Sequence, residues 1–366
     1  MAKSKRKRKQ SPLRQLLNPR RIAIPIVIGL AVATYLLVTE VDFAAFSQVE
    51  FGWGSVGWLL LALLTVVFRD FGYMLRLRIL SGKAIRWRNV FDDIMLWEFS
   101  SAITPSVVGG SGVAIFILNK EGLSVGKSTA VVMTTAFLDE LFYVLMVPLL
   151  FLLVGTENLF PDTVGSVQLL GYTWGIQEAF WLGYGFILLL ISVILIAIFI
   201  APVGFKRVLV GIFHLPLLRR WKRAAVMTGN EIIATSKELK TQPFSFWLRA
   251  FTTTSLSWTA RYLTANFLLL AFTTLTFMDN LIILARQLVM WVIMLISPTP
   301  GGEGVAQLAF ENFLSEYTPI GLAAALAILW RLYTYYPYLF LGALILPQWI
   351  QRVYLKRKLI RFKAPD

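Results

Sequence analysis

The sequence predicts an all-α polytopic membrane protein, in which six transmembrane helices and two re-entrant helical hairpins form an inverted-topology repeat. Three observations support this prediction. Of the 366 residues, 57% are hydrophobic and 14% are aromatic, and the mean hydropathy is +0.69, which is too apolar for a soluble domain of this length. The basic residues gather in clusters between apolar stretches, and a glycine-rich motif occurs twice.

The net charge of +15 lies mainly in four clusters beside apolar stretches, at residues 3–9, 76–88, 206–240 and 352–363. This distribution follows the positive-inside rule and differs from the basic face of a nucleic-acid-binding domain. We therefore expect membrane phospholipids as partners, with anionic headgroups bound at the cytoplasmic face, and no nucleic acid. A homo-oligomer is compatible with the sequence.

The chain has no cysteine and one histidine, His214. The absence of cysteine excludes disulfides, thiolate catalysis and cysteine-based metal sites. His214 lies in a basic loop region, and one histidine cannot build a metal site without nearby carboxylates. A P-loop, a G-x-S-x-G elbow and an H-E-x-x-H motif are also absent from the sequence. We therefore expect no catalytic residue, no metal and no cofactor.

The N-terminal part begins with a basic cytoplasmic segment, residues 1–21, and an apolar span, residues 22–38. The small residues that resemble a signal-peptide cleavage site lie inside this apolar span, so we expect a retained transmembrane helix. Residues 55–80 form the second span and return to a basic loop. Residues 90–118 have basic residues on both sides, which predicts a re-entrant hairpin that enters and leaves on the cytoplasmic side.

The middle of the chain is predicted to cross the membrane twice. Residues 128–154 end in an acidic loop that contains no lysine or arginine, so they cross to the outside. Residues 180–200 cross back. The basic stretch 205–240 then forms an amphipathic segment on the cytoplasmic surface.

The C-terminal part is predicted to repeat this pattern from the other side. Residues 246–277 cross outward, and residues 281–314 form a second hairpin, which enters from the outside because only acidic residues follow it. Residues 321–346 return inward with a bend at Pro337, and a basic cytoplasmic tail follows at residues 348–366. Arg286 fits this topology least well, because it lies in the entering limb of the outer hairpin.

An internal repeat underlies the two hairpins. The segments TPSVVGGSGVAIF, residues 104–116, and ISPTPGGEGVAQLAF, residues 296–310, share the motif GGxGVA at a separation of 192 residues. The same separation also matches Arg69 with Arg261, Asp139 with Arg331, and Tyr143 with Tyr335. We predict repeat units at about residues 55–154 and 246–346, inserted in opposite senses because the single span 180–200 separates them.

The second motif places prolines and glycines in an apolar region, where irregular backbone is tolerated only inside protein or beside a wet cavity. In both motifs the glycines precede a helix-competent run, so we expect free N–H groups and the positive end of the helix dipole to face this cavity. Arginines in the spans would add guanidinium groups that match phosphate oxygens. The candidate substrate-binding residues are Arg69, Arg261, Arg331, Gly109, Gly110, Gly112, Gly301, Gly302, Glu303 and Gly304. The alternative is that the glycines serve helix packing.

Three acidic residues are candidates for proton or amine coupling: Asp139, Glu140 and Glu303. A carboxylate inside a transmembrane span costs roughly 2.5–3.5 kcal/mol, which makes a functional role the default hypothesis. The alternative is structural neutralisation, by pairing of Arg69 with Asp139 or of Arg261 with Glu303. Capping of a helix also accounts for Glu303. The functional hypothesis predicts that Glu303→Gln abolishes transport and leaves folding intact.

The run PTPGGEGVAQLAF followed by AILWRLYTYYPYLFLGAL, within residues 297–344, resembles the flippase-like membrane domain of the lysylphosphatidylglycerol synthase family. The run TPSVVGGSGVAIFILNKEG leading to LDELF is similar but matches more loosely. The resemblance implies a flippase-like domain over residues 22–347, without the aminoacyl-transferase domain of the full synthases. By motif, it carries over to Gly301, Gly302, Glu303, Gly304 and Arg331, and more loosely to Gly109, Gly110 and Asp139.

The function expected from these features is transport of a phospholipid or a lipid-linked headgroup between leaflets, through a polar cavity between the two hairpins. The alternatives are an ion-coupled transporter of a small solute and an intramembrane lipid-modifying transferase. We expect a protein that is not an enzyme, in a bacterial or archaeal cell membrane, with both termini in the cytoplasm.

Overall fold

The computed structural model describes residues 52–104, 107–161, 166–169, 172–215, 219–295 and 303–361. The predicted segments 1–21 and 22–38, and the proline and glycine cluster at residues 296–302, lie outside the described residues. The helices are α3 (Trp53–Leu80), α4 (Trp87–Ile103), α5 (Val107–Glu121), α6 (Val125–Val154), α7 (Ile176–Leu195), α8 (Pro202–Ile212), α9 (Lys222–Lys240), α10 (Phe244–Leu270), α11 (Phe277–Leu295), α12 (Glu303–Leu314), α13 (Ala323–Thr334) and α14 (Tyr336–Arg361). The shorter elements are the strands β1 (Ser166–Leu169) and β2 (Tyr172–Gly175), the π-helical turn η2 (Ile196–Ile200) and the 3-10 turns η3 (Arg219–Trp221) and η4 (Ser315–Tyr317).

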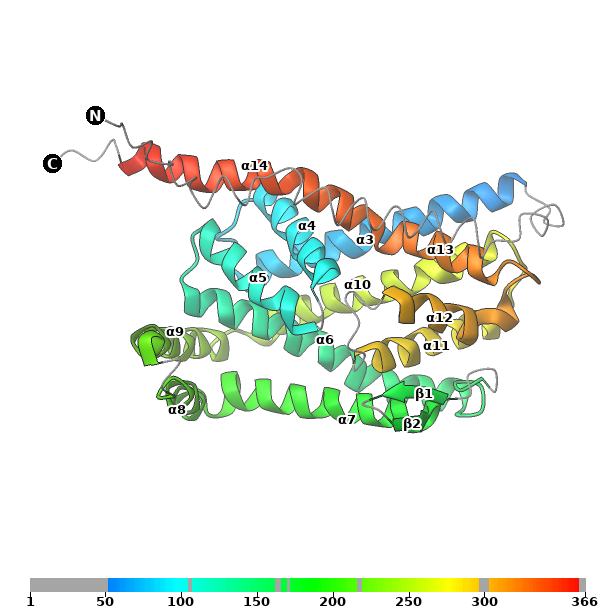
Figure 1. Ribbon diagram of the computed structural model, residues 1–366, viewed down its shortest axis with the longest axis horizontal. Coiled ribbons are helices and arrows are strands. Elements are labelled where there is room, and N and C mark those ends of the chain that lie inside the picture. The colour runs from blue at the N-terminus through cyan, green and yellow to red at the C-terminus, as the bar shows by residue number, and fades with distance from the viewer. Residues whose placement is uncertain are drawn as a thin grey trace, which may run out of the picture.

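The molecule is an elongated helical bundle. Helices α3, α6, α7, α10 and α11 run along its long axis, whereas α8 and α9 lie across that axis at one end (Figure 1). The antiparallel strands β1 and β2 lie toward the opposite end, beside the start of α7 (Figure 1). These strands occupy the stretch that the sequence predicted to be an acidic outer loop.

Large apolar side chains face outward on the long helices, as expected for a bundle surrounded by lipid. Leu60 and Val67 of α3 are 62% and 57% exposed, and Leu189 of α7 is 61% exposed. By length and composition, α3, α6, α11 and the continuous stretch of α7 and η2 can each cross a membrane. Three of these four coincide with predicted spans, and α11 is the entering limb of the predicted outer hairpin.

Two helical hairpins insert into this bundle. Helix α4 packs against α5, and α11 packs against α12. Helix α4 ends at Ile103 and α5 begins at Val107, so the chain does not pass through this region as one helix. In Figure 1, α4 and α5 lie in the half of the bundle that carries α8 and α9, and α11 and α12 lie in the other half. The hairpins therefore enter the bundle from opposite ends.

Helix boundaries recur at the predicted separation of 192 residues. Adding 192 to the ends of α3 gives 245 and 272, and α10 covers residues 244–270. The same addition to α4 gives 279 and 295, and α11 covers residues 277–295. The counterpart of α6 would cover residues 317–346, where the chain instead forms η4, α13 and the first part of α14.

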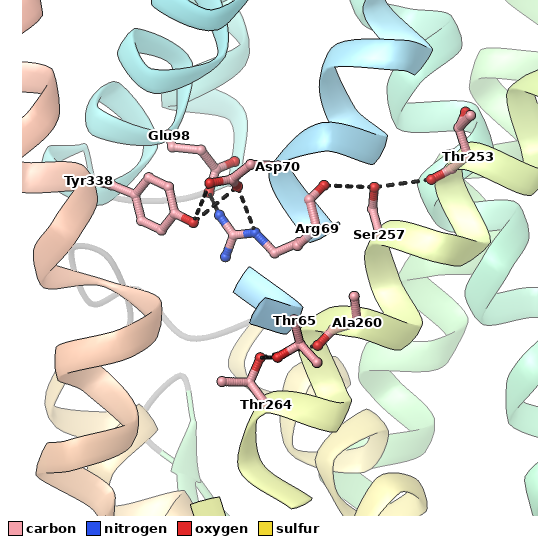
Figure 2. Close-up of polar contacts among 9 residues, drawn as sticks. All are labelled: Thr65, Arg69, Asp70, Glu98, Thr253, Ser257, Ala260, Thr264 and Tyr338. Atoms are coloured by element: carbon pink, nitrogen blue, oxygen red, sulfur yellow. Dashed lines mark hydrogen bonds and ion pairs between the residues drawn. The ribbon is translucent and has the colours of Figure 1, made fainter. Parts of the chain in front are cut away.

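Helices α3 and α10 cross through contacts that obey the same relation. The hydroxyls of Thr65 and Thr264 lie 2.8 Å apart, and Ser257 donates a hydrogen bond to the carbonyl of Arg69 at 3.0 Å (Figure 2). A Cβ atom at Gly72 would lie 2.2 Å from Ser257 Oγ. Thr65 and Ser257 are 192 residues apart, as are Gly72 and Thr264, so the first contact maps onto the last. The two helices are antiparallel, which is the packing expected of repeats with inverted topology.

The structure corrects the predicted path of the final span and adds detail to the predicted amphipathic segment. The final span is not one helix bent at Pro337, because α13 ends at Thr334 and Tyr335 has non-helical dihedrals (φ −128°, ψ −58°). Pro337 instead occupies the first turn of α14, where its missing N–H costs no hydrogen bond. The amphipathic segment is two helices, α8 and α9, that pack against each other.

Arg286 is accommodated by the bundle despite its place in α11. Its side chain is 4% exposed, and its guanidinium donates to the carbonyls of Asn158 at 2.8 Å and Phe313 at 2.9 Å. It also forms an ion pair with Glu316 at 3.1 Å. Arg286 therefore ties α11 to the end of α12 and to the turn after α6, and the hairpin does not expose it to lipid.

Candidate functional site

A cavity of about 290 Å³ lies where the two hairpins meet α6, α10 and α13. Residues from both repeat units line it. The charged lining residues are Arg76, Glu98, Asp139, Glu140, Arg261 and Arg331. Aromatic side chains supply much of the remaining wall, including Trp97, Trp258, Trp291 and Trp330. The sequence predicted a charge-lined cavity between the hairpins, and the cavity described here has that composition.

Asp139 is held by a dense set of donors. Arg76 of α3 contacts both oxygens of its carboxylate, with Nη2 lying 3.3 Å from Oδ2. Trp258 donates its indole N–H to Oδ1 at 2.8 Å, and Arg76 also donates to Thr254 at 3.2 Å. A two-pronged contact between a guanidinium and a carboxylate is among the stronger hydrogen-bonded ion pairs in proteins. The predicted pairing of Asp139 with Arg69 is therefore wrong, since Arg76 occupies that place.

Glu140 differs sharply from its neighbour Asp139. It lines the cavity and is 6% exposed, yet it has no hydrogen-bond or ion-pair partner among the described residues. A buried carboxylate without a donor is costly, and such groups are commonly retained for function. Glu140 is therefore the acid of the cavity wall that is free to meet a cationic group or a proton.

Arg261 is the basic counterpart of Glu140. Its guanidinium carbon lies 4.5 Å from the centre of the Trp291 ring and 5.3 Å from that of Trp258. In the part of the chain that the structure describes, Arg261 forms no salt bridge. Contact with aromatic faces stabilises a desolvated guanidinium by up to about 2 kcal/mol while leaving its N–H groups able to bind an anion. The side chain of Glu303, the predicted ion-pair partner of Arg261, lies outside the part of the chain that the structure describes.

Arg331 also lines the cavity and contacts aromatic rings. Its guanidinium carbon lies 4.1 Å from the centre of the Tyr335 ring, and the side chain is 9% exposed. Arg331 and Asp139 are repeat mates, so equivalent positions of the two units contribute opposite charges to one cavity.

Arg69 lies behind the cavity wall and does not line it. Its side chain is 1% exposed and contacts Asp70 at 3.2 Å and Glu98 at 2.7 Å, as Figure 2 shows. The ring of Tyr338 lies 4.4 Å from its guanidinium carbon, and that of Tyr73 lies 5.5 Å away. The structure therefore separates Arg69 from its repeat mate Arg261, although the sequence grouped them as substrate ligands.

The sequence predicted that the glycines of the first motif precede a helix, whereas in the structure they lie inside one. Helix α5 begins at Val107, so Gly109, Gly110 and Gly112 lie in its first two turns. A Cβ atom at Gly110 would lie 2.0 Å from the Ser101 hydroxyl of α4, so this glycine allows the two limbs to pack closely. Gly112 has nothing within 4 Å and is exposed. Gly301 and Gly302 lie outside the described residues, and Gly304 lies in the first turn of α12.

Sequence reasoning missed several lining residues. Arg76 was grouped with the basic loop, but it lies seven residues after Arg69, which places both on one face of α3. That spacing could have identified Arg76 as a buried residue. Glu98 lies in α4, within the predicted first hairpin, and the sequence assigned it no role. Trp258, Trp291 and Gln287 carried no signal, because aromatic and amide residues are common in apolar helices.

Comparison with known proteins agrees with this architecture. A family model described as the lysylphosphatidylglycerol synthase TM region matches residues 22–342. A protein of Archaeoglobus fulgidus named UPF0104 membrane protein is 24% identical over 333 residues, which cover 87% of this chain and 95% of that protein. The family match includes both hairpins and every charged residue that lines the cavity.

Proposed function

Because the chain belongs to the family of lysylphosphatidylglycerol synthase transmembrane regions, we propose that it is a membrane lipid transporter. It moves a phospholipid or a lipid-linked headgroup between leaflets through the cavity, while the acyl chains remain in the bilayer. The observation that carries this proposal concerns two residues of one cavity: among the described residues, the acid Glu140 has no ion-pair partner, and Arg261 contacts aromatic rings and forms no salt bridge. A headgroup that bears a phosphate and a cationic group can bind Arg261 through the phosphate and Glu140 through the cationic group.

The arrangement of the hairpins supports transport. Each hairpin extends from one end of the bundle to its middle, so we interpret both as re-entrant and the two repeat units as inverted. A binding site between inverted repeats can open toward either side when the units exchange conformations. No ATP-binding motif is present in the sequence, so lipid movement in this scheme is downhill or ion-coupled.

The roles of the cavity residues follow from their contacts. Arg261, supported by Arg331, binds phosphate oxygens, and Glu140 binds the cationic group or a proton. Asp139 keeps Arg76 neutralised and positioned and does not itself meet the substrate. This division revises the expectation that Asp139 and Glu140 act alike. Glu303 remains a candidate for coupling, because its repeat mate Ser111 lines the cavity.

The orientation in the membrane follows from charge. Helices α8 and α9 carry lysines and arginines and lie across the bundle axis, as helices in the membrane interface do (Figure 1). We place this end in the cytoplasm, against anionic headgroups, which also places the basic C-terminal part there. The end that carries β1 and β2 then faces outward.

Two alternatives remain open to experiment. A small zwitterionic solute would also fit a cavity of about 290 Å³ with this lining, and a cavity sealed from lipid would favour it. A lipid-modifying transferase would need to hold Mg²⁺ through the adjacent acids Asp92 and Asp93 or Asp139 and Glu140. Asp92 is paired with Arg352 and Asp139 with Arg76, so one acid of each pair is already neutralised.

Reconstitution tests the proposal. Purified protein in vesicles should exchange tail-labelled phosphatidylethanolamine or phosphatidylglycerol between leaflets faster than empty vesicles do. Arg261→Gln and Glu140→Gln should each slow exchange at least about tenfold, which corresponds to a loss of about 1.4 kcal/mol of transition-state stabilisation. The matched controls are Arg249→Gln, an exposed arginine on the same helix as Arg261, and Glu238→Gln, an exposed acid on α9. Exchange no faster than in empty vesicles would refute the proposal.

A further inference from the structure

We propose that Asp70 and Glu98, which share the single guanidinium of Arg69, hold one exchangeable proton. The proton site rests on the contacts around Arg69 alone. Its use to drive transport rests on the proposed function above.

The site joins three elements of the bundle. Arg69 and Asp70 belong to α3, Glu98 to the inner limb of the first hairpin, and Tyr338 to α14. Figure 2 shows the Arg69 guanidinium between the two carboxylates, with the Tyr338 hydroxyl directed at Asp70. Among the described residues, Arg69 is the only basic side chain within ion-pair distance of either acid. Two partly buried carboxylates therefore compete for the positive charge of one fully buried guanidinium.

The charge balance favours a bound proton. With both acids ionised, the cluster would carry one uncompensated negative charge, which is expensive inside a membrane protein. One proton on either acid removes it. The other charged or titratable groups that line the cavity beside Glu98 or act on the cluster are Tyr73, Arg76, Asp139, Glu140, Arg261, Arg331 and Tyr338. Arg331 lies against the ring of Tyr335. Arg76 is committed to Asp139, and Arg261 is held against the rings of Trp258 and Trp291.

The geometry of Arg69 suits a proton that moves between two acids. Each acid receives one nitrogen, Nε for Asp70 and Nη2 for Glu98, whereas Arg76 holds Asp139 with two. Nη1 of Arg69 is buried and has no hydrogen-bond partner among the described residues. Arg69 therefore keeps spare donor capacity and can follow the negative charge from one acid to the other without breaking a two-pronged contact.

The contact with Tyr338 suits both the ionised and the protonated form of Asp70. Its hydroxyl oxygen lies 3.0 Å from Oδ1 and 2.9 Å from Oδ2 of Asp70. One hydroxyl proton can serve only one of these oxygens at a time. A protonated Asp70 can donate to the Tyr338 oxygen in return, so the contact accepts both charge states of the acid.

The site communicates with the cavity through one residue. Glu98 lines the cavity, whereas Arg69 and Asp70 lie behind it. Of the two acids that share Arg69, Glu98 is therefore the one that a proton can reach from the cavity. Protonation of Glu98 removes its negative charge and weakens its contact with Arg69, so that Asp70 becomes the ionised acid of the pair. The contact between Glu98 and Arg69 is one of the links between the first hairpin and α3. Proton binding and the position of α4 are therefore coupled.

The first experiment detects the proton without any lipid substrate. Purified protein in phosphatidylcholine vesicles is titrated from about pH 5 to about pH 9, above the ordinary range of carboxyl groups. The infrared band of protonated carboxyl groups is recorded as the difference between wild type and each variant. Asp70→Asn and Glu98→Gln should each remove a titrating band of the same size, because the remaining acid then has Arg69 to itself.

The exposed pair of Glu238 with Lys127 supplies the control, since Glu238→Gln should remove no such band. Either cluster variant alone decides the result if the other does not fold. A difference spectrum without a carboxyl band, from a folded Asp70→Asn or Glu98→Gln protein, would overturn the proton site.

The second experiment measures coupling. With the membrane potential held at zero, a gradient of one pH unit should drive the leaflet ratio of a labelled phospholipid up to about tenfold, if one proton moves with each lipid. In Asp70→Asn the ratio should stay near one. If wild-type protein exchanges lipid but the leaflet ratio does not change with the pH gradient, coupling is refuted and the proposed function is left intact. A titrating band without lipid exchange would refute the proposed function and leave the proton site intact.

Discussion

The crossing of α3 and α10 can be tested by adding one methyl group at Gly72. The new Cβ atom of Gly72→Ala would lie 2.2 Å from Ser257 Oγ and 3.0 Å from the carbonyl oxygen of Thr253. The Ser257 hydroxyl cannot simply rotate away, because its oxygen lies 3.0 Å from the carbonyl oxygens of both Arg69 and Thr253 and donates its one proton to either of them. The Thr253 carbonyl belongs to the helix backbone and cannot move alone. The helices must therefore separate.

The expected loss is the balance of two terms. Overpacking a tight contact costs about 1–3 kcal/mol, whereas replacing a helical glycine with alanine gains about 0.5–1 kcal/mol. The free energy of unfolding should therefore fall by up to about 2.5 kcal/mol for Gly72→Ala, with a central value of about 1 kcal/mol. Gly57→Ala on the same helix is the matched control, because nothing lies within 4 Å of its Cβ position. That variant should gain about 0.5–1 kcal/mol from helix propensity.

Reversible unfolding in mixed detergent micelles, followed by circular dichroism, measures both variants. Ser257→Ala removes the hydroxyl that the new methyl group meets first. The double variant Gly72→Ala/Ser257→Ala should therefore be about as stable as Ser257→Ala alone, with a coupling energy of about 1 kcal/mol. Equal stability of Gly72→Ala and Gly57→Ala, or strict additivity in the double variant, would show that the helices do not cross here as described.

Three further changes have defined outcomes. Asp139→Ala should lower the free energy of unfolding by about 3–5 kcal/mol, because Arg76 is then buried without an ion-pair partner. The double variant Asp139→Met/Arg76→Met should recover most of that loss in the same unfolding assay. Gly183→Ala should cost about 1–3 kcal/mol because its Cβ would lie 2.6 Å from the backbone oxygen of Val292, and a neutral result would contradict the packing of α7 on α11. Arg286→Met should leave two backbone carbonyls without their donor, at about 1–3 kcal/mol each, and should speed proteolysis near α12, whereas unchanged cleavage would argue against this anchor.

The sequence predicted the elements whose signals are strong and local. The described spans were recognised from long apolar stretches and the absence of lysine and arginine in the outer loops. The offset of 192 residues predicted the correspondence of α3 with α10 and of α4 with α11, because the repeat preserves helix lengths as well as motifs. The break between α4 and α5 lies inside the predicted hairpin, residues 90–118, at the start of the segment that carries the first glycine motif.

Partner choice among buried charges could not be predicted in the same way. Arg69 and Arg76 lie on one face of α3, two turns apart, and each could reach an acid on α4 or α6. Which acid each one meets depends on the relative shift of α3, α4 and α6 along the bundle axis, and sequence periodicity does not report that shift. The packing role of Gly110 was missed for the same reason, because its contact with Ser101 depends on how closely two limbs approach.

The two repeat units have similar helix boundaries but differ in the charge of equivalent residues, and this difference matters for the proposed function. Asp139 and Arg331 are equivalent positions, yet they bring opposite charges to one cavity, and Tyr143 and Tyr335 accompany them there. A cavity built from two identical halves would present a symmetric field, which suits a symmetric ion. In the first unit Arg76 neutralises Asp139, and Glu140 beside it is the acid that would meet a substrate, whereas the second unit contributes Arg261 and Arg331. Under the proposed function, a headgroup with separated charges would therefore bind in one orientation, and it would keep that orientation when the units exchange conformations.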